Sequence, residues 1–163
     1  MPTNTEIENE LSRLAVRDAA DNMVVSTPLH IKAIADVLQE QGLPQVYFIA
    51  DRAYLVTSIR EMHDYAQTSA DGVSLQVSKV TGTTAPTIGS DGANFITTTA
   101  YAGGDFTIRG FDMKGIAVNT VTDGTLTTIA SSLTLAAGDR LVYGINGTLQ
   151  STFVSLTTVL RKV

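Results

Sequence analysis

The alternation of apolar and polar positions is the strongest pattern in the chain, and it predicts β-strands over most of its length. Val73, Leu75 and Val77 alternate with serine and glutamine, which is the two-residue period of a half-buried strand. From Gln45 onward, about nine such segments follow one another between turns rich in glycine, asparagine and aspartate. The clearest of these segments cover residues 46–49, 53–60, 73–78, 115–121, 125–130, 140–145 and 152–161.

Two turn sequences in this region are specific enough to predict local geometry. The sequence TDG at residues 122–124 predicts a hairpin between two neighbouring strands, because glycine accepts the positive φ that tight hairpins need. The sequence AGDRL at residues 137–141 predicts a turn in which Gly138 takes an unusual backbone angle and Asp139 hydrogen-bonds to nearby amides. Many short strands with regular turns predict a mainly β fold, an antiparallel β-sandwich of the jelly-roll type.

Helical spacing of apolar residues predicts a first helix ahead of the β region. Thr5 and Glu8 have the spacing of a capping box, in which each side chain satisfies a free backbone amide of the other's turn. Acidic residues precede basic ones along this helix, in the order that the helix dipole favours. We expect the helix to end near Asp21 and Asn22, with an apolar face made of Ile7, Leu11, Leu14 and Ala15.

A second helix is predicted to start a few residues later. Ser26 or Thr27 can cap it, and Pro28 suits the first helical position because its missing N–H would be unpaired there. Gly42 is a plausible left-handed stop, and Pro44 prevents continuation. The apolar face of this second helix comprises Ile31, Ile34, Val37 and Leu38.

The composition changes at Gln45, so the chain divides into a helical segment, 1–44, and a β domain, 45–163. A chain of 163 residues can bury about 70 % of its unfolded surface, so a core forms without disulfides or metals. There is no cysteine, which excludes disulfides, zinc–thiolate sites and thiol nucleophiles.

Charge and hydropathy narrow the range of partners. The net charge is −5, and the eleven basic residues are scattered, which argues against nucleic acid because nucleic acid selects a clustered basic footprint. No apolar run approaches the ~20 residues that a membrane span requires. The polar, acidic N-terminus does not have the pattern of a signal peptide. We therefore expect a soluble protein that is made in a cytoplasm and binds neither nucleic acid nor membrane.

The two histidines are the first candidates for chemistry. His63 and Asp64 could be a general base and its orienting carboxylate, but adjacent residues on a strand point to opposite faces. We interpret His63 as a surface residue beside a turn, and His30 as an ordinary residue of the second helix.

Metal and nucleophile signatures are weak. Asp71, Asp91 and Asp123 each precede glycine, which is foremost a turn dipeptide, and none has the alternating acidic spacing of a calcium loop. No Gly-x-Ser-x-Gly elbow accompanies the many serines. The sequence therefore predicts no catalytic residue, no cofactor and no bound metal.

A long polar loop at residues 81–92 is the clearest candidate for a binding surface outside the strands. Loops on a rigid β scaffold often carry binding, and this one offers Thr83, Thr84, Thr87 and Asp91. The threonine-rich strands suit a soluble outer face, since branching at Cβ favours extended backbone. A sugar-binding face usually adds exposed aromatic platforms, and tryptophan is absent.

Three stretches carry a resemblance to a known family. They read VYFIADRAYLVTSIREMHDYAQT from residue 46, ADGVSLQVSKVTGTTAPTIG from residue 70 and SSLTLAAGDRLVYGINGT from residue 131. A final threonine-rich strand ends in basic residues. The chain resembles the small jelly-roll virion proteins of tailed bacteriophages that decorate capsids or form short head fibres and that usually trimerise. The AGDRL turn and the VTGT loop at residues 80–83 are its most specific parts.

The resemblance implies a non-enzymatic structural protein of the virion. It would be a homotrimer on the capsid surface, made in the host cytoplasm, with the major capsid protein as its partner. The helical segment would attach it to the capsid through the apolar residues Ile7, Leu11, Leu14, Ile31, Ile34 and Leu38.

Two other functions stay open. One is a tail or fibre-tip module that binds a host glycan or receptor through the polar loop at residues 81–92 and the region 94–104. The other is a hydrolase or lyase whose site is assembled between subunits, for which the candidate residues are His63, Asp64 and Asp91.

Overall fold

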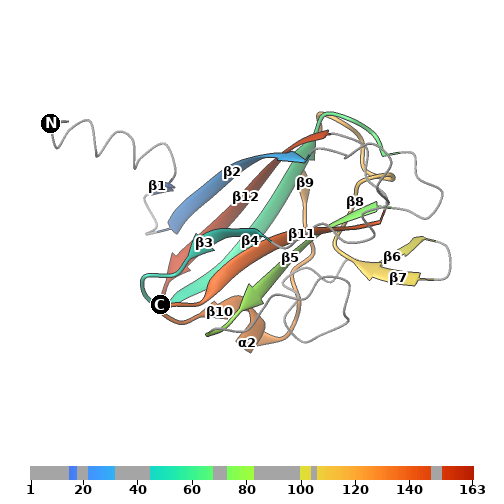
Figure 1. Cartoon of the computed structure of the whole chain (residues 1–163). Helices are drawn as coiled ribbons and strands as arrows, with labels where there is room; N and C mark the ends of the chain where they lie inside the picture. The colour runs from blue at the N-terminus through green and yellow to red at the C-terminus, as the bar shows by residue number, and fades with distance from the viewer. Residues whose placement is uncertain are drawn as a thin grey trace, which may run out of the picture.

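The protein is mainly β. The computed structural model describes residues 15–17, 22–31, 45–67, 73–82, 100–103, 106–147 and 152–163. Two antiparallel sheets dominate these residues, and Figure 1 shows the long strands of the two sheets running alongside each other. This arrangement agrees with the predicted β-sandwich.

The first sheet contains the longest strands. Its strand order is β1-β2-β12-β4-β10, and β9 also pairs with β4. The strands are β1 (Ala15–Arg17), β2 (Asn22–Ile31), β12 (Thr152–Lys162), β4 (Tyr54–His63), β10 (Thr134–Leu135) and β9 (Thr122–Asp123). The central strand β12 pairs along its length with both β2 and β4.

The second sheet has the order β3-β11-β5-β8. A separate two-stranded sheet and one short helix complete the described elements. Their bounds are β3 (Gln45–Ile49), β11 (Arg140–Gly147), β5 (Val73–Val80), β8 (Phe111–Asp112), β6 (Ala100–Gly103), β7 (Phe106–Arg109) and α2 (Ala130–Leu133).

The hydrophobic core lies between the two sheets. The first sheet contributes side chains such as Ile59, Leu156 and Leu160, and the second contributes Leu75 and Leu141, all with no exposed surface. Tyr47 adds a polar bridge, because its hydroxyl lies 2.9 Å from Thr158 Oγ1 on the opposite sheet. Burial raises the pKa of the Tyr47 hydroxyl well above its usual range, so the bridge stays protonated.

The second predicted helix is wrong where the structure describes it. Residues 22–31 form strand β2, which pairs with β12 from Asn22 to Ile31, so Ser26, Thr27 and Pro28 lie within a strand. His30 is likewise a strand residue. Residues 15–17, placed in the first helix, form β1. Pairing with β12 outweighs a helix-start signal that is only local, and Pro28 is accommodated in the strand next to the sheet edge.

Strand β5 is present as predicted, but it is not half-buried. Both of its faces are covered: Ser74 and Gln76 are as buried as Leu75. Gly110, with φ of +142°, lies so close that an added Cβ would be 2.5 Å from Leu75 O and 3.1 Å from Gln76 Cγ. The alternation of residue types therefore marks two kinds of buried face, one apolar and one hydrogen-bonded.

The predicted hairpin at residues 122–124 is also wrong. Thr122 and Asp123 form strand β9, which pairs with Glu61 and Arg60 of β4, and Gly124 N–H donates to Ile59 O at 2.8 Å. The turn sequence is thus used as a short edge strand. A distant strand supplies the hydrogen bonds that a local hairpin would have made.

The structure confirms the predicted geometry of the AGDRL turn at residues 137–141. Gly138 has φ of +87°, and Asp139 Oδ2 accepts a hydrogen bond from Ala136 N–H at 2.8 Å. The backbone of the turn also pairs with Ala50: Gly138 N–H donates to Ala50 O at 2.7 Å, and Ala50 N–H donates to Asp139 O at 2.8 Å. These bonds join the turn to the chain between β3 and β4.

Candidate functional site

Most of the residues predicted from the sequence to attach or bind lie outside the described part of the chain. This holds for the attachment residues Ile7, Leu11, Leu14, Ile34 and Leu38, and for the loop residues Thr83, Thr84, Thr87 and Asp91. Ile31 is the last residue of β2, not part of a helical face. The structure therefore directs attention to two other places on the sandwich.

The first place is a buried acid–imidazole pair on strand β4. Ile59, Glu61 and His63 are two residues apart, so all three point toward the core side of the first sheet. Their neighbours on β12 are apolar: Leu156 lies opposite Glu61, and Val154 lies opposite His63. Strand periodicity thus directs a charged pair into an apolar interior.

The geometry of the pair is that of a hydrogen-bonded couple. His63 Nδ1 lies 3.1 Å from Glu61 Oε2 and 3.3 Å from Oε1, and neither side chain has exposed surface. Burial raises the pKa of Glu61, and the hydrogen bond and charge of His63 only partly offset that effect. His63 Nε2 is buried without a hydrogen-bond partner among the described residues. The prediction of a surface histidine is therefore wrong.

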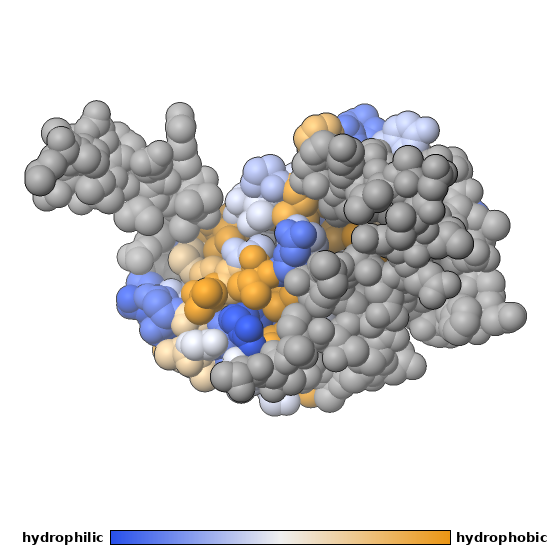
Figure 2. All heavy atoms as spheres, in the orientation of Figure 1, coloured by the Kyte–Doolittle hydropathy of each residue, from blue (hydrophilic) through white to orange (hydrophobic). Residues whose placement is uncertain are grey.

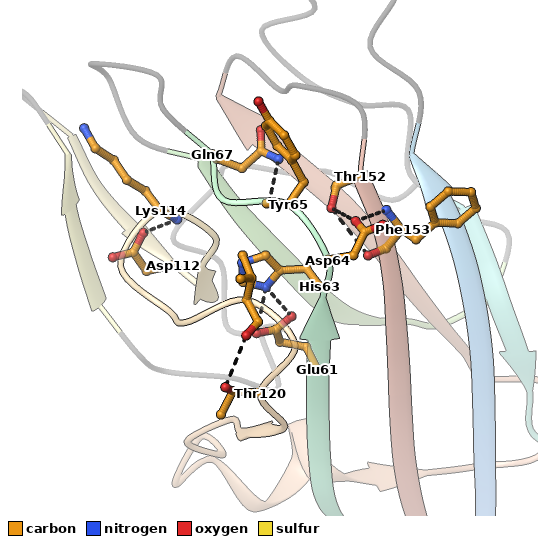
Figure 3. A network of polar contacts seen from close by, with 11 residues as sticks. Glu61, His63, Asp64, Tyr65, Gln67, Asp112, Lys114, Thr120, Thr152 and Phe153 are labelled. Atoms are coloured by element: carbon orange, nitrogen blue, oxygen red, sulfur yellow. Dashed lines mark hydrogen bonds and ion pairs between the residues drawn. The ribbon is translucent and has the colours of Figure 1, made fainter.

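A surface segment, residues 113–121, passes beside this pair and is mostly exposed after Met113 (Figure 3). Its start is fixed by Met113 N–H, which donates to Val73 O at 2.9 Å, and Asn119 N–H donates to the carbonyl of His63 at 2.7 Å. The segment then continues into β9, where Thr122 pairs with Glu61. Figure 3 shows the segment passing beside the two side chains.

Asp64 turns away from the pair and serves a different purpose. Its Oδ1 accepts hydrogen bonds from Phe153 N–H at 2.8 Å and from Thr152 Oγ1 at 2.9 Å (Figure 3). These bonds, led by the backbone bond from Phe153, lower the pKa of Asp64. Asp64 thus ties the end of β4 to the start of β12. The expectation that it does not orient His63 is in keeping with this geometry.

The arrangement can hold a proton in a place that solvent does not reach in this structure. Both members of the pair lie beneath the surface, and a general base must come within hydrogen-bond reach of the group that it serves. Within the described ranges, no three His, Cys, Asp or Glu side chains group closely enough to hold a metal ion.

Sequence reasoning missed the role of Glu61, although a signal was there. Glu61 and His63 continue the two-residue alternation that starts at Ile59, after an extra residue of β4, Thr57, shifts its register against β12. The signal was the two-residue spacing of Glu61 and His63, which places both on one face of the strand, whereas the adjacent residues His63 and Asp64 lie on opposite faces.

The second place is the outer side of edge strand β3. A register shift at Tyr47 lets Val46 face Val142 while Ile49 faces Arg140, so Val46 and Ile49 share the face that points away from the core. Val46 is 43 % and Ile49 is 62 % exposed. Figure 2 shows hydrophobic atoms at the surface where β3 lies in Figure 1. We call Val46 and Ile49 the β3 apolar surface.

Comparison with protein-family models, with curated proteins and with solved structures found no match to this chain. None of the described residues belongs to a helix with the length and hydropathy needed to cross a membrane.

Proposed function

We propose that this protein is a non-enzymatic structural protein of a tailed-bacteriophage virion: a homotrimeric jelly roll that binds the major capsid protein and decorates the capsid surface. The observation that carries the proposal is the β3 apolar surface on an antiparallel sandwich. The sequence resemblance in the AGDRL turn and the flanking strands supports it.

An exposed apolar edge favours association with another subunit. Strand β3 is the last strand of its described sheet and carries no charged residue, so no charge on the strand opposes contact with another subunit. Burying apolar surface contributes about 25 cal/mol per Å². In a trimer, each subunit covers one such surface of the next around the axis, which closes the assembly without leaving an open edge.

Native mass measured by light scattering during size-exclusion chromatography, over a range of dilutions, tests the trimer. We expect a trimer that survives dilution, and we expect Ile49→Asp to weaken it because a charge would be buried at the contact. The matched control is Val121→Asp, which introduces the same charge at a position 63 % exposed on β9's side of the sandwich. A stable monomer, or equal weakening by both substitutions, would contradict the role of β3.

Capsid attachment needs a separate test. A chain without residues 1–44 would also lose strand β2, so point substitutions are the sharper probe. We expect Leu11→Asp to reduce co-sedimentation with empty capsids while the trimer persists, because apolar contact dominates the core of a protein interface. Unchanged capsid binding by folded Leu11→Asp and Leu14→Asp variants would contradict attachment through this segment.

A further inference from the structure

The buried pair on β4 carries an inference that goes beyond virion assembly. Glu61 and His63 are buried titratable groups that bond to each other and that the proposed function does not use. They lie where the surface segment 113–121 meets the sandwich. The backbone of His63 accepts a hydrogen bond from Asn119 N–H, and the backbone of Glu61 pairs with Thr122, just after the segment. Loss or gain of one proton in this place changes the charge directly beneath the segment.

In the described part of the chain, His63 is the charged group that acts on Glu61, and the charge of Asp64 interacts weakly with His63. Among the described residues, β12 presents Val154 and Leu156, and β9 presents Thr122. The other charged side chains on the neighbouring elements bond to other groups or are exposed to solvent. Arg60 pairs with Asp123 at 2.7 Å, Asp64 holds β12, Asp112 Oδ1 accepts the amide of Lys114, and the Lys114 side chain is exposed.

With one proton, the pair is neutral as a unit, either as carboxylate with imidazolium or as carboxylic acid with imidazole. Without that proton, a net negative charge remains in an apolar interior, which is strongly unfavourable. Burial raises the pKa of Glu61 above its ordinary value. The stability linked to this group is therefore present in acid and is lost as the pH rises, the same direction as the charge argument gives.

We propose that the Glu61–His63 pair is a pH-sensitive latch, which holds residues 113–124 against strand β4 while it carries one proton and loosens them when that proton is lost. The effect is local because the backbone of the same stretch of β4 bonds to this segment, through the carbonyls of His63 and Ile59. At the other end of β4, the turn at residues 136–139 is held by Ala50 and Asp139.

Amide hydrogen exchange in the full chain tests the latch. The reporters are the amides of Asn119, which donates to His63 O, and Gly124, which donates to Ile59 O; the internal control is Gly138, which donates to Ala50 O. As the pH is raised above 4.5, the ordinary pKa of a glutamate, we expect the protection factors of both reporters to fall once the proton is lost, by up to tenfold per pH unit, the limit for one proton. Protection at Gly138 should stay constant.

Two variants assign the proton. Glu61→Gln removes the carboxylate and keeps its size, so the reporters should show flat protection across this range. Asp51→Asn changes an exposed carboxylate near the other end of β4, where it pairs with Arg52, and should keep the wild-type dependence. The latch is overturned if wild-type reporter protection is flat, if Gly138 falls in parallel, or if Glu61→Gln retains the dependence. Should Glu61→Gln fail to fold, the contrast between the reporters and Gly138 in the wild type still decides.

Discussion

The two ends of strand β4 are attached to the rest of the sandwich in different ways. At its start, near Tyr54, the AGDRL turn bonds to Ala50 through backbone groups and through Asp139. At its end, Glu61 and His63 place a titratable pair inside the sandwich beneath a surface segment. The first end is fixed by a turn whose bonds to Ala50 are made between backbone groups. The second is fixed by tertiary burial, so its stability depends on a proton.

The largest expected effect comes from breaking the buried pair. His63→Ala removes the imidazole and leaves Glu61 uncompensated, so we expect a loss of about 3–5 kcal/mol in the free energy of unfolding at pH 8. The loss should shrink in acid, because protonation of Glu61 removes the buried charge. Urea denaturation at pH 5 and pH 8 measures both values. The double variant His63→Ala/Glu61→Leu should recover much of the loss; no recovery would contradict the charge argument.

The corresponding change at the turn end is Asp139→Ala. It leaves the amide of Ala136 without its acceptor in a partly buried place, and Lys79 Nζ, 3.9 Å from Asp139 Oδ2, loses a nearby carboxylate. We expect a loss of about 2 kcal/mol. Asp139→Asn keeps an oxygen acceptor and should cost less. Equal losses in the two variants, measured by urea denaturation at pH 7, would mean that the hydrogen bond is not what Asp139 contributes.

Gly138 tests the backbone of the same turn. A Cβ there would meet no atom within 4 Å, so the cost of Gly138→Ala comes from the positive φ of +87° alone. We expect a loss of about 1–2 kcal/mol, measured by thermal or urea unfolding. Gly138→Asn should lose less, since asparagine tolerates this region better. If alanine were tolerated without loss, the turn would be free to adopt another geometry.

Asp64 should give a pH dependence of opposite sign to that of Glu61. Its pKa lies below the ordinary 3.8, so its ionised form contributes stability above that pH, which is lost as the pH falls through the lowered value. The gap between wild type and Asp64→Ala should therefore close in strong acid. The gap between wild type and Glu61→Gln should change as the pH rises above 4.5. Unfolding curves from pH 3 to pH 8 measure both, and parallel profiles would contradict the distinction.

The sequence by itself determined the parts that depend on neighbours along the chain. The alternation in β5, β11 and β12 predicted strands because side chains of a strand alternate between faces. The AGDRL turn was predicted in detail because Gly138 and Asp139 act within a few residues of each other. The absence of cysteine likewise excluded disulfide bonds as a source of stability.

Only the tertiary structure decided the rest. Residues 22–31 have a local helix-start signal, yet in the sandwich they pair with β12 along their length and bury Val25 and Leu29 in the core. TDG became an edge strand for the same reason, because β4 lay beside it. The burial of Glu61 and His63 depends on what covers β4, namely a segment some fifty residues later in the sequence. The local sequence determines the conformational propensity of a residue, whereas its burial and its hydrogen-bond partners are determined by residues far away in the sequence.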